Sequence, residues 1–159
     1  MTLQEINQLP RERFVQALGW IFEHSPWVAE RARPSRPFSS LLALHEAMVR
    51  QVEAASSEEQ TALLRAHPDL GSRARMSDAS TGEQNGAGLH ALTPAEFETL
   101  RDYRARFGFP FLYAVKGSTK QEIIEALTQR LHRSPEQEFR EALHQVFRIA
   151  RFRLEDFIE

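Results

Sequence analysis

The chain contains no cysteine, which excludes a disulfide framework, a thiolate metal site and a cysteine nucleophile. It also lacks a charge excess, because 20 Lys and Arg stand against 22 Asp and Glu for a net charge of −2. Nothing in that balance indicates a nucleic-acid partner or an anionic membrane partner. No apolar run approaches the ~20 residues of a membrane span, and the first residues lack a basic-then-apolar secretion signal. These absences predict a soluble, cytoplasmic protein.

What is present fits one ordinary globular domain. The chain has 159 residues, of which 42% are hydrophobic and 26% are charged, close to the average for soluble domains. We find neither an internal repeat nor a linker. The sequence therefore predicts a single domain over residues 1–159.

Signals for helix starts recur along the chain. A hydroxyl residue precedes proline, which tolerates the first helical position because its missing N–H has no partner there. Elsewhere a hydroxyl residue precedes Glu or Gln by three positions, the spacing of a capping box. The first pattern occurs at Ser25-Pro26, Thr93-Pro94 and Ser134-Pro135, and the second at Thr2, Ser57, Thr93 and Ser134.

Apolar residues between these starts follow a helical period. The stripes contain Phe14, Leu18, Ile21 and Phe22; Leu41, Leu42, Leu44, Met48 and Val52; Phe97, Leu100, Tyr103 and Phe107; Ile123, Ile124, Leu127 and Leu131; and a last set from Phe139 to Leu154. One strand-like run, 109–115, contains a proline and has no second strand to pair with. We therefore predict an all-α helical bundle with one extended connector at 109–116.

Four of the seven glycines lie between Gly71 and Gly88, where the helical stripe lapses. Glycine is costly inside a packed helix and useful where the backbone turns sharply or approaches a ligand. Composition alone leaves two interpretations open, a functional loop or a surface excursion.

His67 is the strongest candidate among six histidines. Pro68 follows it and disfavours the α conformation at His67, so the helix through Ala62–Ala66 should end there and project the imidazole. An alternative is a helix-terminal histidine that only complements the helix dipole. The other five have ordinary interpretations as turn or helix residues: His24, His45, His90, His132 and His144.

Two further segments are candidates for binding. Ser80, Thr81, Gly82, Glu83 and Gln84 combine a hydroxyl, a carboxylate and a carboxamide, which together can recognise a polar heterocycle; the structural alternative is a capping box from Ser80 to Glu83. The aromatics of 107–111 are either core residues or the wall of a pocket with exposed peptide groups. No pair of histidines has metalloprotease spacing and no carboxylate cluster flanks them, so we expect no metal site.

Three motifs in order resemble the 2-oxo-4-hydroxy-4-carboxy-5-ureidoimidazoline (OHCU) decarboxylase family. They are His67-Pro68-Asp69-Leu70-Gly71, Ser80-x-x-Glu83-Gln84 with Ala87-Gly88-Leu89, and Phe107-Gly108-Phe109-Pro110-Phe111. The early segments Phe14–Gly19 and Arg36–Phe38 and the C-terminal helices extend the resemblance over essentially the whole chain.

The resemblance implies a helical bundle that converts OHCU to (S)-allantoin in urate breakdown, without metal or organic cofactor and often as a homodimer. It implies His67 as the catalytic histidine, and we expect Glu83 to be catalytic as well, by orienting His67 or binding the ureido group. The substrate-binding residues would be Pro68, Ser80, Thr81, Gly82, Glu83, Gln84, Phe111, Leu112, Tyr113, Ala114 and Val115. Two departures stand out: a spacer from Gly71 to Ser80 shorter than in animal members, and Lys116 where those members carry arginine.

Other functions remain alternatives at this point. In a non-catalytic helical interaction domain, His67 would be a helix terminus and Ser80 a cap. A ureide hydrolase is disfavoured because cyclic amide hydrolysis commonly uses metal-activated water.

Overall fold

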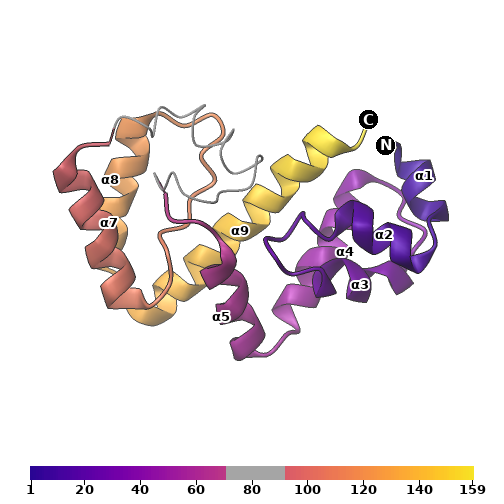
Figure 1. Ribbon diagram of the computed structural model, residues 1–159, viewed down its shortest axis with the longest axis horizontal. Coiled ribbons are helices and arrows are strands. Elements are labelled where there is room, and N and C mark those ends of the chain that lie inside the picture. Colours follow the sequence, from indigo (N-terminus) through magenta and orange to yellow (C-terminus); the bar gives the residue numbers. More distant parts are fainter. Residues whose placement is uncertain (71–91) are drawn as a thin grey trace. The chain divides into compact units, whose positions relative to one another are not determined.

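The computed structural model describes residues 1–70 and 92–159, and within these ranges every regular element is a helix (Figure 1). The elements are α1 (Leu3–Gln8), α2 (Arg11–Leu18), α3 (Trp27–Ala32), η1 (Arg33–Ser35), α4 (Leu41–Glu53), α5 (Ser57–Ala66), α7 (Pro94–Phe107), α8 (Lys120–Arg130) and α9 (Pro135–Phe157). The all-α prediction is confirmed. None of the helices in these ranges is both long and apolar enough to cross a membrane.

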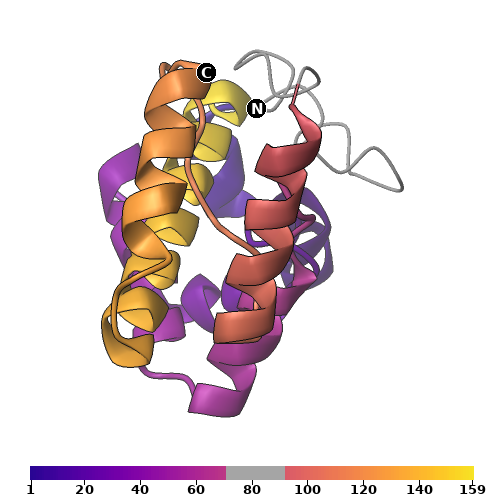
Figure 2. The same cartoon turned by 90° about the vertical axis from the view of Figure 1, so that its left-hand side faces the viewer.

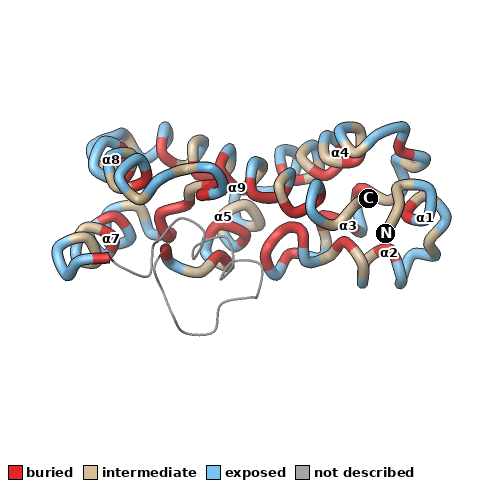
Figure 3. The backbone as a smooth tube through the Cα atoms, turned by 90° about the horizontal axis from the view of Figure 1, so that it is seen from above, coloured by how far each residue is buried: buried red, intermediate tan, exposed pale blue. Residues whose placement is uncertain are grey.

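The chain divides into two compact units. One comprises Met1–Ala66 with Phe147–Glu159, and the other comprises His67–Val146, so α9 contributes residues to both. In each unit the buried positions recur along one side of the helices (Figure 3). A single domain over 1–159 stays a prediction.

Most predicted helix starts are confirmed. Thr2 and Thr93 both form complete capping boxes, with Glu5 and Glu96 respectively. At the start of α9, the Gln137 N–H donates to Ser134 Oγ and the Ser134 N–H donates to Gln137 Oε1, each at 3.2 Å. These reciprocal bonds satisfy N–H groups that have no partner inside the helix.

Two predicted starts are wrong in detail. The cap of α5 is Ser56, whose Oγ accepts from the Glu59 N–H at 3.1 Å, and Ser57 is the first helical residue. At α3 the cap residue is Pro26, without a side-chain cap. The Ser25 hydroxyl donates to the Glu23 carbonyl at 2.9 Å instead, because the preceding turn competes for it.

The stripes of the first unit are buried except for Leu41, which is half-buried, and Leu42. Phe14, Ile21 and Phe22 are buried, although α2 ends at Leu18 and the last two belong to the turn after it. Leu42, which we placed in the apolar stripe of α4, is 46% exposed. Leucine on a helix surface is common and needs no buried partner.

The second unit carries the connector. α7 ends at Gly108, whose φ of 79° is left-handed, a conformation that glycine adopts without strain. The chain then runs without regular structure through Val115 and turns at Lys116 and Gly117 before α8 (Figures 1 and 2). Aromatic rings pack around its first half, with Tyr103 at 5.2 Å from Phe111 between ring centroids and Phe109 at 6.2 Å from Phe139. The connector is therefore a buried wall of this unit.

Candidate active site

His67 lies directly after the last residue of α5, as predicted. The helix ends at Ala66 because Pro68 disfavours a helical conformation at the residue before it. The His67 residue is only 5% exposed, whereas Pro68 is half-buried. Burial restricts the orientations that the imidazole can adopt, which suits a group that must transfer a proton.

The other described histidines differ from His67 in burial. His132 and His144 are exposed, and the His24 side chain is 78% exposed. His45 is half-buried, and its Nε2 donates to the Phe147 carbonyl at 2.8 Å. Burial lowers the pKa of His45, opposed by that hydrogen bond, and both features are typical of a structural histidine. His90 lies outside the described residues.

The segment after His67 is tied to α7. Asp69 forms an ion pair with Arg104 at 3.0 Å, with both side chains nearly half exposed. A hollow of about 210 Å³ opens beside this pair, lined by Asp69, Leu70, Phe97, Leu100, Arg101 and Arg104. An exposed pair of this kind contributes about 0–1 kcal/mol, so it adds little to the stability of the fold.

The predicted binding residues of the connector lie in the second unit, as His67 does. Phe111, Leu112, Ala114 and Val115 are buried and Tyr113 is half-buried. Lys116, the position of the family departure, is exposed. Burial of a segment without regular structure requires partners for its peptide groups, and two side chains provide partners for two of these groups.

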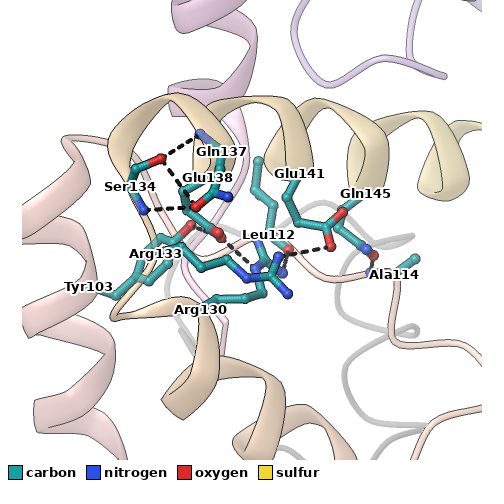
Figure 4. A network of polar contacts seen from close by, with 10 residues as sticks. All are labelled: Tyr103, Leu112, Ala114, Arg130, Arg133, Ser134, Gln137, Glu138, Glu141 and Gln145. Atoms are coloured by element: carbon teal, nitrogen blue, oxygen red, sulfur yellow. Dashed lines mark hydrogen bonds and ion pairs between the residues drawn. The ribbon is translucent and has the colours of Figure 1, made fainter.

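Those two side chains come from the neighbouring helices (Figure 4). Arg130 Nη1, from the end of α8, donates to the Leu112 carbonyl at 2.7 Å. Gln145 Oε1, from α9, accepts from the Ala114 N–H at 2.9 Å. The Arg130 guanidinium also lies 4.4 Å from the Phe111 ring centroid, a cation–π distance.

Arg130 belongs to a buried ion pair. Its Nε donates to Glu138 Oε1, which also accepts from the Tyr103 hydroxyl at 2.6 Å. Burial raises the pKa of Tyr103, and the bond to Glu138 adds to this, so the phenol remains a donor. Among the described residues, Arg130 Nη2 and Glu138 Oε2 have no hydrogen-bond partner.

Sequence reasoning did not identify Arg130, Glu138 or Gln145. A signal was present, because each polar residue continues a buried stripe at helical spacing: Arg130 follows Ile123 and Leu127, and Glu138, Ala142 and Gln145 lie on one face of α9. A charged residue on an apolar stripe indicates a buried polar contact.

The remaining predicted site residues cannot be placed. Ser80, Thr81, Gly82, Glu83 and Gln84, together with the short spacer before them, lie outside the described residues. Within residues 1–70 and 92–159, no group of three or more His, Asp or Glu side chains could hold a metal ion.

Comparison with known proteins agrees with the motifs. The OHCU decarboxylase family model matches residues 7–155. The chain is 52% identical to the 2-oxo-4-hydroxy-4-carboxy-5-ureidoimidazoline decarboxylase of Haloferax volcanii, covering 97% of this chain and 94% of that protein. It is also 48% identical to the uric acid degradation bifunctional protein PucL of Bacillus subtilis, over 99% of this chain but 33% of the longer protein.

Solved structures show the same fold. A crystal structure of (S)-allantoin synthase aligns with a TM-score of 0.80 and 34% identity, covering all of this chain and 54% of that one. A structure of OHCU decarboxylase in the presence of (S)-allantoin aligns at 0.64 with 22% identity, which shows a shared fold. With a family model matched from residue 7 to residue 155, this chain belongs to the OHCU decarboxylase family.

Proposed function

We propose that this chain decarboxylates OHCU to (S)-allantoin in urate degradation, without metal or organic cofactor, and that His67 is its general acid and base. Membership of the family makes it a decarboxylase. The observation that carries the proposal for His67 is its burial at the end of α5, directly before Pro68, in a chain of this family. The two alternatives, an interaction domain or a hydrolase, have no comparable support.

The substrate's own chemistry explains how a cofactor can be dispensed with. When the bond to the carboxylate breaks, CO₂ leaves and the electron pair forms a double bond to the neighbouring ring carbon. The ring C=N accepts the displaced pair at nitrogen, which takes up a proton. The substrate thus supplies the electron sink that other decarboxylases obtain from a cofactor.

The protein then has two tasks. It must remove the proton of the hydroxyl as the carbonyl forms, and it must deliver a proton to the carbon bearing the ureido group. A histidine exchanges protons near neutral pH and can do both in turn. Delivery of this proton from one fixed side of the ring would yield a single enantiomer, which we propose to be (S).

Substrate recognition completes the proposal. Pro68, next to His67, and residues Phe111–Val115 would offer backbone groups to the ureido and ring amides. Glu83 would tune His67 or bind the ureido group, and Gln84 would recognise the ring amide. Ser80, Thr81 and Gly82 would complete this segment.

Two further proposals concern the cellular location and the oligomeric state of the protein. The absence of cysteine suits a reducing cytoplasm, and the family resemblance suggests a homodimer. Fractionation of cells and sedimentation of the purified protein would test them separately.

The activity is tested with freshly generated OHCU followed by circular dichroism. We expect the protein to accelerate formation of one allantoin enantiomer, because directed protonation creates one stereocentre. Exhaustive chelation and dialysis should leave kcat unchanged. Racemic product at the uncatalysed rate would contradict the activity, and restoration of a lost activity by a divalent ion would contradict the absence of a cofactor.

Glu83→Gln separates the catalytic role from the capping role. Glutamine serves equally well in a capping box, so a purely structural Glu83 predicts a stability loss of a few tenths of a kcal/mol with kcat unchanged. We expect instead a fall in kcat/KM of about 10²-fold or more, as for a lost proton-transfer partner. The His67 pKa should fall too, moving the acidic limb of the pH–rate profile downward.

The matched variant is Gln84→Glu, which replaces amide donors with a group that only accepts. It should weaken substrate binding while leaving the acidic limb in place. Normal kinetics with a slightly lower Tm in Glu83→Gln would identify Glu83 as a helix cap.

A further inference from the structure

We propose that Arg130 and Gln145 are positioning residues for the reaction, holding one edge of the connector so that its other edge is free to recognise the ureide. The inference rests on the proposed function, because it takes residues 111–115 to bind substrate. Neither side chain needs to touch the substrate for this role. Each acts through the peptide group that it holds.

The first argument is the spacing of the two contacts. Arg130 Nη1 holds the Leu112 carbonyl and Gln145 Oε1 holds the Ala114 N–H. In an extended chain, the N–H and C=O of a residue point to one edge, and those of the next residue to the other. Residues 110–115 contain no helix, turn or bend and run extended. Contacts two residues apart therefore hold the same edge, and the opposite edge carries the peptide groups of Phe111 and Tyr113.

The peptide groups on that opposite edge are available to bind a ligand. Within the described part of the chain, the backbone N–H and C=O groups of Phe111 and Tyr113 form no hydrogen bond. Buried or half-buried peptide groups need partners. A ureide carries N–H donors beside carbonyl acceptors, the same alternation as a strand edge, so it can satisfy such groups in the manner of an added strand.

The second argument concerns why a charged pair is buried here. Arg130 is 3% exposed and Glu138 is fully buried. The pair leaves one polar atom on each partner without a hydrogen bond among the described residues, and imperfect buried pairs are a poor source of stability. The arrangement does, however, fix the guanidinium against the Leu112 carbonyl. A single chain segment without a strand partner needs such external fixation.

The test uses Gln145→Met, which keeps the length of the side chain and removes the acceptor. We expect KM for OHCU to rise about 10-fold with kcat changed less than about twofold, because the connector binds parts of the substrate that do not react. Gln145→Glu retains the acceptor oxygen and should restore KM to within about threefold of the wild type. Arg130→Lys keeps a positive charge beside Glu138 but lacks the guanidinium fork, so it should raise KM as Gln145→Met does.

Asn7→Leu is the matched control. Asn7 also holds backbone with its side chain, donating to the Phe38 carbonyl at 3.0 Å and accepting from the Phe38 N–H at 2.8 Å, in the other unit. It should lower Tm and leave KM unchanged. A rise in KM equal to that of Gln145→Met would overturn the proposal, because general destabilisation would then explain both.

Hydrogen exchange of the ligand-free protein provides a readout that does not depend on activity. Gln145→Met should accelerate exchange of the Ala114 amide and its neighbours at least 10-fold, and Gln145→Glu should not. Unchanged exchange, or wild-type KM despite faster exchange, would refute the positioning role. A wild-type protein that forms no allantoin would instead refute the proposed function.

Discussion

Replacement of His67 by asparagine is expected to lower kcat by about 10²–10⁴-fold, the usual contribution of a positioned general acid or base. Asparagine is close in size and polar, so the buried site at the end of α5 should retain its packing. It cannot exchange a proton near neutral pH. The measurement is turnover of freshly generated OHCU together with helical circular dichroism, which should not change.

His132→Asn is the control, because His132 is exposed beyond the end of α8 and its loss should leave turnover unaffected. A His67→Asn protein that folds normally and turns over at the wild-type rate would remove His67 from the mechanism. The family assignment would survive that result, since it rests on the whole chain.

Glu138→Ala should reduce the free energy of unfolding by about 3–5 kcal/mol, the cost of removing one partner from a buried ion pair. The change leaves the buried Arg130 guanidinium without its counter-charge and the Tyr103 hydroxyl without its acceptor. Urea denaturation followed by circular dichroism measures the loss.

Glu141→Ala provides the comparison on the same helix. Glu141 pairs with Arg133 at 3.5 Å, with the side chains 28% and 42% exposed, and such surface pairs contribute about 0–1 kcal/mol. Similar losses for both variants would show that burial does not determine the importance of the Glu138 pair. Replacing Arg130 and Glu138 together by apolar residues should recover much of the stability, because no charge then remains buried.

The sequence predicts the helices well because their ends are specified by local chemistry. Thr93, Pro94 and Glu96 begin α7 and Gly108 ends it, all through contacts within a few residues. The start of α5 was misplaced by one residue because the sequence offers two equivalent caps. Ser56 and Ser57 each have Glu or Gln three positions later, and only the packed helix selects between them.

The candidate site could likewise be predicted only where local chemistry specifies it. His67 could be found because Pro68 acts on its immediate neighbour, whereas the contacts that hold the connector join residues 18 and 31 positions apart. A polar residue on an apolar stripe shows that a buried partner is needed, but it does not identify the partner. That choice depends on how α8 and α9 lie against the connector.

The way the connector is held affects how this part of the protein can vary. Arg130 and Gln145 contact peptide groups of Leu112 and Ala114, which persist whatever side chain those positions carry, proline at 114 excepted. A point substitution in the connector can therefore change its packing without deleting a held group. The path of the segment therefore depends on the two helices beside it. We expect substitutions in those helices to change substrate preference more readily than substitutions in the connector.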